Sequence, residues 1–234
     1  ANRAPNDANI LLLDEPLGVF YGYKTDGTFD TIDEIMDSAQ PSAKPGDVKI
    51  IDQNEDKVIN ENDRVVLGNA QPKFFGGFNN QFNYKGFDLA LFFRFSYGND
   101  IYNLNRFNLQ DLNGKRNNTT AVLDRWTEDN KDTDIPRASS VKTSNFSTDR
   151  EVEDGSYLRL KSVQLGYNIS PNLFNGAIRN MRVYITGENL WTLTNYSGYD
   201  PEVSAYGASN VKMGYDGSTY PSVKTLKLGF NLSF

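Results

Sequence analysis

The sequence predicts an all-β fold, an antiparallel transmembrane β-barrel of which this chain holds about six strands. Segments of roughly ten residues alternate between apolar and polar side chains, and tight turns alternate with long polar connections between these segments. No apolar run approaches the ~20 residues that a membrane-spanning helix needs. Aromatic residues make up 13% of the 234 residues and charged residues 23%, a mixture that suits strands with one apolar and one polar face.

The clearest element is a predicted hairpin formed by strands over residues 73–84 and 87–98, joined at Lys85-Gly86. A two-residue turn needs backbone with positive φ, which glycine adopts without strain. This turn places Phe78 opposite Phe93. Directly paired residues share a side of a sheet, so one side of the hairpin becomes almost continuously aromatic and aliphatic.

Four further strands are predicted from the same alternation. Residues 223–234 form one of them, with strict alternation over residues 225–234, and residues 181–192 alternate over most of their length. Residues 156–169 alternate with one change of parity, which indicates a β-bulge near Lys161-Ser162. Residues 18–24 are a weaker candidate and complete the set of six.

The connections between these strands alternate in length. The long polar ones cover residues 25–72, 99–155 and 193–222, and the short ones lie at residues 85–86 and 170–180. Outer-membrane barrels have tight periplasmic turns and long extracellular loops, so we expect the three long segments to be extracellular and the C-terminus to be periplasmic. The alternative fold is a secreted β-sandwich, whose strands also alternate and which would make the chain a carbohydrate-binding protein.

Composition excludes several classes of function. The chain has no Cys and no His, which removes Cys nucleophiles, Ser-His-Asp triads and nearly every zinc site. A net charge of −6 argues against a nucleic-acid partner. Acidic groups at residues 128–134 and 151–154 lie in predicted loops and are interpreted as solvated surface, so we expect no catalytic residue. The first residues lack the features of a signal peptide and an initiating Met, so we expect the chain to begin in mid-protein or after processing.

The last predicted strand resembles the signal by which the barrel-assembly machinery recognises outer-membrane proteins. A polar residue, a glycine two positions later, alternating apolar residues and a terminal aromatic residue make up this pattern: Lys227, Gly229, Leu232 and Phe234. Recognition of this kind works by strand addition, in which backbone pairing supplies affinity and alternate side chains supply selectivity. The alternative is an ordinary edge strand that ends in Phe.

One acidic segment in the first long connection resembles the calcium-binding loop of an EF-hand. Oxygen ligands fall at the required spacing over six residues: Asp52, Asn54, Asp56, Val58 (through its carbonyl), Asn60 and Asp63. The glycine expected at the sixth position is Lys57, and Asp63 is shorter than the bidentate Glu expected at the last position. Calcium is therefore one prediction, and a metal-free solvated loop is the other.

Aromatic residues in the predicted outer loops are candidates for stacking on sugars or contacting a lid protein. They are Trp126, Tyr196, Tyr199, Tyr206 and Tyr220. The same side chains could equally pack the loops, because tyrosine and tryptophan combine an apolar ring with a polar tip. The sequence assigns none of them to a substrate.

Short blocks spread over the whole chain resemble the SusC/RagA family of TonB-linked outer-membrane proteins. Each block is weak alone, and their order and spacing together are similar to the last strands of that family's barrel. The blocks are residues 18–24, 46–49, 52–56, 64–69, 72–77, 95–102, 156–161, 165–167, 187–190 and 198–202.

This resemblance implies a barrel of about 22 strands with an N-terminal plug, in the bacterial outer membrane. It further implies active import of oligosaccharides or peptides, energised through the TonB complex and assisted by a SusD-like surface lipoprotein. The alternative is a passive or non-transporting barrel that serves as a scaffold in an envelope complex. Six strands cannot close a barrel, and an open sheet edge in lipid costs several kcal/mol for each unpaired backbone group. We therefore expect the remaining strands to come from another part of the polypeptide or from a companion chain.

Overall fold

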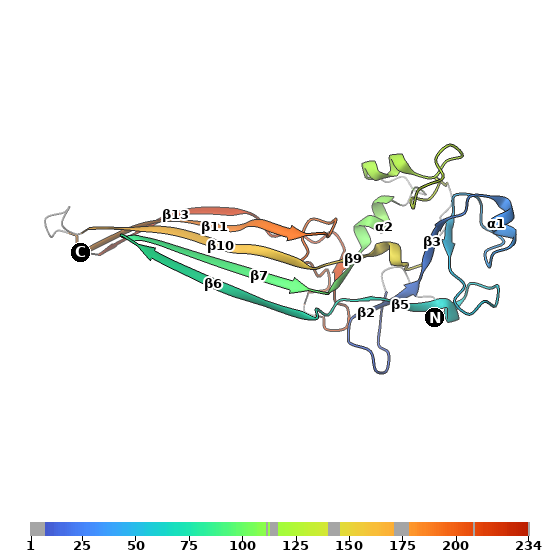
Figure 1. Ribbon diagram of the computed structural model, residues 1–234, viewed down its shortest axis with the longest axis horizontal. Coiled ribbons are helices and arrows are strands. Elements are labelled where there is room, and N and C mark those ends of the chain that lie inside the picture. Colours follow the sequence, from blue (N-terminus) through green and yellow to red (C-terminus); the bar gives the residue numbers. More distant parts are fainter. Residues whose placement is uncertain are drawn as a thin grey trace. The chain divides into compact units, whose positions relative to one another are not determined.

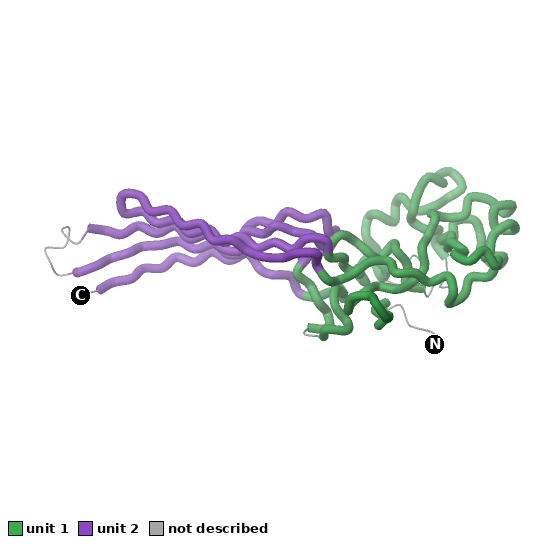
Figure 2. The backbone as a smooth tube through the Cα atoms, turned by 60° about the horizontal axis from the view of Figure 1, so that its bottom comes forward, with its two compact units in different colours: residues 1–71, 99–154, 202–219 green, residues 72–98, 155–201, 220–234 purple. Residues whose placement is uncertain are grey.

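The computed structural model describes residues 8–110, 112, 117–139, 146–170, 178–207 and 209–233. The chain divides into two compact units, each of which is built from three stretches of sequence (Figure 2). Unit 1 contains residues 1–71, 99–154 and 202–219, and unit 2 contains residues 72–98, 155–201 and 220–234. Within the described residues, no helix has the length and apolar character needed to cross a membrane.

Unit 2 is one antiparallel sheet of five long strands in the order β13-β11-β10-β7-β6 (Figure 1). Its strands are β6 (Phe74–Tyr84), β7 (Phe87–Tyr97), β10 (Tyr157–Ile169), β11 (Asn180–Thr194) and β13 (Thr225–Ser233). We call the end of the sheet with Lys85-Gly86 the turn end and the opposite end the loop end. Strand β11 begins at the turn end, where Tyr167 of β10 pairs with both Val183 and Phe87. Ser233 pairs with Asn180, the first residue of β11, so the last strand, β13, ends at the turn end.

The predicted hairpin is confirmed in its register. Phe78 pairs with Phe93, and their rings stack with centroids 4.9 Å apart. Lys85 and Gly86 both have positive φ, at 44° and 88°. Two consecutive positive φ values are characteristic of a type I′ turn, whose twist matches that of the flanking strands.

The β-bulge in β10 is also confirmed. The register shifts between Leu160 and Ser162 against both neighbouring strands. Leu160 then pairs with Phe93, while beyond the shift Val163 pairs with Leu91. The bulge thus returns the apolar residues on both sides of it to the same face of the sheet.

The five strands together present one apolar and one polar face. Adjacent rows across the sheet on the apolar face are Tyr84, Phe87, Tyr167, Val183, Phe230, and Phe82, Leu89, Leu165, Ile185, Leu228. The intervening row on the polar face is Asn83, Asp88, Gly166, Tyr184, Gly229, and the row beyond Phe82 and Leu89 is again polar, with Gln81, Ala90, Gln164, Thr186, Lys227. Leu228 is 80% exposed, and the described part of unit 2 contains no second sheet. A β-sandwich would need one to cover this face.

Unit 1 is built from short elements. One sheet joins β1 (Asn9–Ile10), β2 (Val19–Tyr23) and β5 (Arg64–Asn69); a second joins β12 (Tyr215–Asp216), β8 (Asp100–Asn103) and β9 (Val152–Asp154); β3 (Thr25–Thr28) pairs with β4 (Val48–Ile50). The helices are α1 (Ile32–Met36) and α2 (Leu104–Gln110), with 3-10 turns at Glu61–Asp63, Thr120–Asp124 and Asp149–Glu151. Phe20, Tyr102 and Tyr215 meet in its core with ring centroids 5.3 to 5.9 Å apart. The long connections therefore fold into a unit with its own core.

The prediction that residues 18–24 add a sixth strand to the large sheet is wrong. β2 is a strand, but it pairs with β1 and β5 inside unit 1. Val19, Phe20, Gly22 and Tyr23 are all buried, so this strand is covered on both faces. A strand that is buried on both faces lacks the one-sided pattern of a barrel wall.

Candidate functional site

The polar face of unit 2 carries paired charges. Unit 2 contains three carboxylates by sequence, and each forms an ion pair: Asp88 with Arg182, Glu188 with Lys227, and Asp200 with Arg159. The closest nitrogen–oxygen distances are 2.5, 2.8 and 2.5 Å in that order. With its carboxylates paired and nine basic residues in its sequence, unit 2 has an excess of positive charge.

Two glycines allow large side chains to lie flat on this face. Gly166, Tyr184 and Gly229 occupy one row across β10, β11 and β13. A Cβ atom added at Gly229 would come within 3.0 Å of the Tyr184 ring, and one added at Gly166 would come equally near the ion pair of Arg182 and Asp88. The Arg182 guanidinium also lies 4.9 Å from the centroid of the Tyr184 ring. The polar face of the sheet is therefore flat at this row, and the side chains of Tyr184 and Arg182 lie over the two glycines.

The predicted assembly signal lies on β13, an edge strand of the five-stranded sheet. Lys227 and Gly229 are on its polar face, and Leu232 is on its apolar face opposite Met181. Phe234 lies outside the described residues. Sequence reasoning missed the contact of Gly229 with Tyr184, because a residue 45 positions away along the chain gives no local signal.

The acidic segment predicted to bind calcium forms a compact loop with an EF-hand-like hydrogen-bond frame. The Lys57 N–H donates to Asp52 Oδ2 at 2.7 Å, and Lys57 has a φ of 62° at the position where EF-hands use glycine. Asp63 accepts from the backbone N–H groups of Gln53 and Asn60, at 2.9 and 2.7 Å. The loop thus closes through its first and last carboxylates.

The same side chains do not converge on a single point. Within the described residues no three acidic side chains are grouped so that they could hold a metal ion. The Asn54 side-chain amide donates to Asp56, and the Asn60 side-chain amide donates to the carbonyl of Val58. These candidate ligands therefore form hydrogen bonds with one another. Asp52 Oδ1 is buried and makes no hydrogen bond. Calcium binding therefore stays a prediction.

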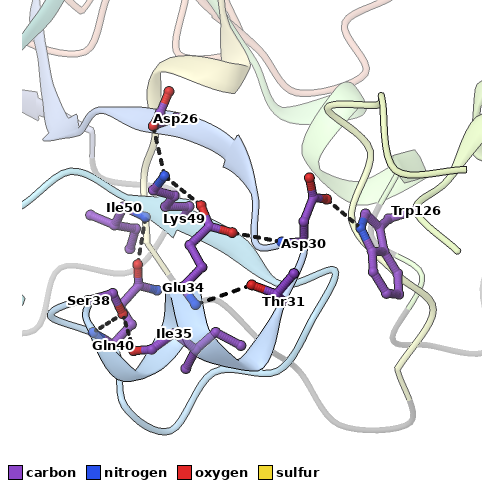
Figure 3. Close-up of polar contacts among 10 residues, drawn as sticks. All are labelled: Asp26, Asp30, Thr31, Glu34, Ile35, Ser38, Gln40, Lys49, Ile50 and Trp126. Atoms are coloured by element: carbon purple, nitrogen blue, oxygen red, sulfur yellow. Dashed lines mark hydrogen bonds and ion pairs between the residues drawn. The ribbon is translucent and has the colours of Figure 1, made fainter. Parts of the chain in front are cut away.

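Among the five candidate aromatic residues, Trp126 has a structural role. Its indole N–H donates to Asp30 at 3.1 Å beside the α1 segment (Figure 3). A Cβ added at Gly46 would overlap the Trp126 ring, so the ring packs directly on that backbone. Lys49, held by Asp26 and Glu34 at 3.0 and 2.8 Å, orders the same segment. Trp126 is buried by these neighbours and is not available to a ligand.

The other four aromatic residues divide into packed and exposed pairs. Tyr196 is buried, and Tyr206 packs edge-on against Tyr215 with ring centroids 5.4 Å apart. Tyr199 and Tyr220 are 83% and 84% exposed. The structure therefore leaves these two as the candidates for contact with a ligand or partner.

A buried ion pair anchors the segments that carry these two tyrosines. The side chains of Arg159 and Asp200 are only 3% and 6% exposed. Arg159 also donates from Nε to Thr192 Oγ1 at 3.0 Å, and Asp200 accepts from the Ser222 N–H at 2.8 Å. The blocks over residues 156–161 and 198–202 contain both charged residues, yet nothing in the sequence indicated that they pair.

Comparison with curated proteins finds TonB-dependent receptors. No protein-family model matches the chain. The chain is similar to TonB-dependent receptors P3 and P26 of Formosa agariphila, each 36% identical over 96% of this chain and 23% of the relative. It is 24% identical to TonB-dependent receptor SusC of Bacteroides thetaiotaomicron over 82% of this chain and 18% of SusC. The chain thus spans about a quarter of the length of these relatives or less.

Solved structures give the same result for the fold. The RagAB peptide transporter superposes with a TM-score of 0.77 at 26% identity, covering 98% of this chain and 24% of the matched chain. The RagAB peptide importer in its "open-open" state gives 0.74 at 27% identity, over 99% of this chain and 24% of that chain. The mostly β-stranded structure therefore matches part of the RagA barrel, and the described strands do not themselves close into a barrel.

The two-faced sheet and these similarities define the class of protein as an outer-membrane receptor. Within that class, the chain belongs to the SusC/RagA family of TonB-dependent receptors, as its sequence blocks predicted.

Proposed function

We propose that this chain supplies the C-terminal strands of a closed transmembrane β-barrel, of about 22 strands, in an importer energised by TonB. The observation that supports this proposal best is the continuous apolar face of the five-stranded sheet, on which Leu226, Leu228 and Phe230 are largely exposed. Exposure of such an apolar face to water is unfavourable, whereas contact with the apolar tails of lipids is favourable. The opposite, polar face would line the passage for cargo.

The orientation follows from the lengths of the connections. In a barrel of this type the tight turns are periplasmic and the long loops extracellular. We therefore assign the turn end, with Lys85-Gly86 and Ser233, to the periplasm. The long connections that fold into unit 1 would lie outside the cell.

The proposed partners are a SusD-like surface lipoprotein, the TonB complex, the barrel-assembly machinery and the lipid of the outer membrane. The solved structures that resemble this chain are described as RagAB, a peptide transporter or importer. A two-component importer of this kind takes up a molecule too large for passive diffusion. Oligosaccharides and peptides are the two cargo classes that fit.

Uptake by cells that produce the full-length receptor tests the proposal. We expect these cells to accumulate a labelled oligosaccharide or peptide cargo, and we expect deletion of tonB to abolish accumulation while the receptor remains in the outer membrane. Accumulation that continues at the same rate without TonB would indicate a passive pore. A receptor that moves no cargo in either strain would indicate a scaffold.

A further inference from the structure

Asn80 is a polar side chain on the apolar face of the unit 2 sheet. The row of paired residues that contains it is Asn80, Leu91, Val163, Gly187, Leu226. This row follows the apolar row that contains Phe82 and Leu228, two residues further along each strand. The Asn80 amide is therefore on the surface that we propose contacts lipid.

Asn80 lies well inside the apolar band that β6 would carry across the membrane. Tyr84 marks one boundary of this band, because the Lys85 ammonium lies 5.2 Å from its ring centroid and needs water or lipid headgroups. Phe74 and Tyr97 pair at the other end of the hairpin. Asn80 is four residues from Tyr84 and six from Phe74 along β6. At ~3.3 Å per residue and a tilt of ~40°, it lies ~10 Å and ~15 Å from these boundaries, too deep for a short amide to reach water.

The side chains around Asn80 in this sheet offer its amide no hydrogen bond. Five of them surround it on the apolar face, and all five are hydrocarbon: Phe78 and Phe82 along β6, and Leu89, Leu91 and Phe93 on β7. An unpaired amide in lipid is unfavourable, because its N–H and C=O groups lose their hydrogen bonds to water. A partner for Asn80 therefore has to come from outside the five-stranded sheet.

One side of Asn80 is open to such a partner. β6 is an edge strand of the sheet, and β7 occupies its other side (Figure 1). In the closed barrel proposed above, another strand pairs with this free edge, because unpaired backbone groups are unfavourable in lipid. A residue directly opposite Asn80 on that strand would have its Cβ ~4.5–5.5 Å away, on the same face. Two side chains at this separation can share a hydrogen bond.

We infer that Asn80 forms an intramembrane hydrogen bond with a polar side chain of the strand that adjoins β6 in the closed barrel. Serine, threonine, asparagine and glutamine fit, since they offer a donor or an acceptor without a charge. This inference rests on the proposed barrel, and it places a polar residue on a strand that the described sheet does not contain. The contact also fixes the register of that strand, because a shift by one residue turns the partner to the opposite face.

Urea unfolding of the full-length receptor in lipid vesicles distinguishes a paired from an unpaired amide by the sign of one change. Asn80→Leu removes the amide and keeps a side chain of similar size. If Asn80 is paired, this substitution leaves the partner's polar group unpaired in lipid, and we expect the unfolding equilibrium constant to rise by about tenfold. If Asn80 faces lipid alone, the same substitution removes an unfavourable group and lowers that constant.

Two control substitutions calibrate this measurement. Val163 lies in the same row as Asn80, and it pairs with Leu91 and Gly187. Val163→Asn should raise the unfolding constant more than Val163→Ala does, because the paired neighbours offer the new amide no hydrogen-bonding side chain. Asn80→Ser retains a donor and an acceptor, so its unfolding constant should lie closer to that of the unmodified receptor than the constant of Asn80→Leu does.

Disulfide cross-linking identifies the partner without requiring Asn80→Leu to fold. Asn80→Cys is combined with single cysteines at successive lipid-facing positions of the adjoining strand, in a full-length receptor without other cysteines. A disulfide forms where the two Cβ atoms come within ~3.5–4.5 Å of each other. We expect the fastest cross-link within one receptor molecule, at a position that natively holds a polar side chain.

Three outcomes would overturn the inference: Asn80→Leu stabilises the receptor, the cross-linked position natively holds an apolar residue, or Asn80→Cys cross-links only to a second receptor molecule. The last result would indicate an interface between two barrels. TonB-dependent uptake tests the importer separately. Uptake that persists in a stabilised Asn80→Leu receptor would preserve the importer and remove this contact. An intact contact in a receptor that moves no cargo would do the reverse.

Discussion

Removing the Asp200 carboxylate tests how the loop end of the sheet is held together. Asp200→Ala deletes the hydrogen bonds from Arg159 and from the Ser222 N–H and leaves the guanidinium without its counter-ion. Because both side chains are buried, breaking the pair costs about 3–5 kcal/mol, whereas hydrogen bonds to a charged group contribute about 1.5–3 kcal/mol each. The segment over residues 195–201 can lift away and hydrate Arg159, so we expect local detachment and no global unfolding.

Hydrogen exchange measured by mass spectrometry reports that detachment directly. A loss of about 3 kcal/mol of local stability corresponds to an increase of more than ~100-fold in the opening equilibrium. We expect the increase in peptides that cover residues 195–201 and 220–224. Peptides from the β6–β7 hairpin should be unchanged, because their backbone pairing does not depend on Asp200.

The matched control is Glu188→Ala, which breaks the pair with Lys227. Those side chains are 38% and 56% exposed, and an exposed pair of this kind contributes only ~0–1 kcal/mol. Replacing both buried partners, as Arg159→Met with Asp200→Leu, should restore much of the protection, because a buried pair can be replaced by apolar side chains. Equal and small effects of Asp200→Ala and Glu188→Ala would refute the argument.

Three other measurements address separate parts of the chain. Gly229→Ala should reduce the yield of folded, heat-modifiable receptor, because its Cβ overlaps the Tyr184 ring, and Tyr184→Ala in the same chain should restore it; a yield that Tyr184→Ala does not restore would refute the packing role. Burial raises the pKa of Glu151, so folded unit 1 holds a proton more tightly than the unfolded chain, and its stability should fall as the pH rises above about 4.5. Hydrogen-exchange protection of β8, corrected for intrinsic exchange, should show this decline, and Glu151→Gln should remove it; a decline that persists in Glu151→Gln would contradict the assignment. Calorimetric titration with calcium should release heat that Asp52→Asn abolishes if the acidic loop binds the ion, and no heat at millimolar calcium ends that prediction.

The sheet of unit 2 was predictable from the sequence because each of its long strands repeats with a period of two residues. The Lys85-Gly86 turn fixes the register of the first two strands, so Phe78 opposite Phe93 follows from counting. The bulge at Lys161-Ser162 is visible as a change of parity in an otherwise regular strand. These signals are local, and tertiary contacts reinforce them.

Unit 1 was not predictable in this way. Its strands are two to six residues long, too short for a pattern to emerge, and β12 pairs in parallel with β8 from more than 100 residues away. Phe20, Tyr102 and Tyr215 come from three separate segments before they meet in one core. Sequence reasoning therefore treated these segments as loops, and it placed β2 in the wrong sheet.

The candidate site shows the same limit. Exposed and buried aromatic residues look alike in the sequence, so Trp126 and Tyr199 stood together as candidates until the structure separated them. The pairing of Arg159 with Asp200 depends on where a long connection returns to the sheet. Single charged residues in such connections carry no periodic signal, and only the three-dimensional arrangement identifies them.

The central claim is that the apolar face of unit 2 contacts lipid and the polar face contacts water. The chain has no native cysteine, so single cysteines can be placed at Leu165 and at its neighbour Gln164, which lie on opposite faces of β10. In membranes, we expect a fluorophore at residue 165 to be quenched by nitroxide-labelled lipid and protected from a water-soluble thiol reagent. Residue 164 should show the opposite behaviour. Equal water accessibility at both positions, or quenching by lipid at residue 164 alone, would contradict the account.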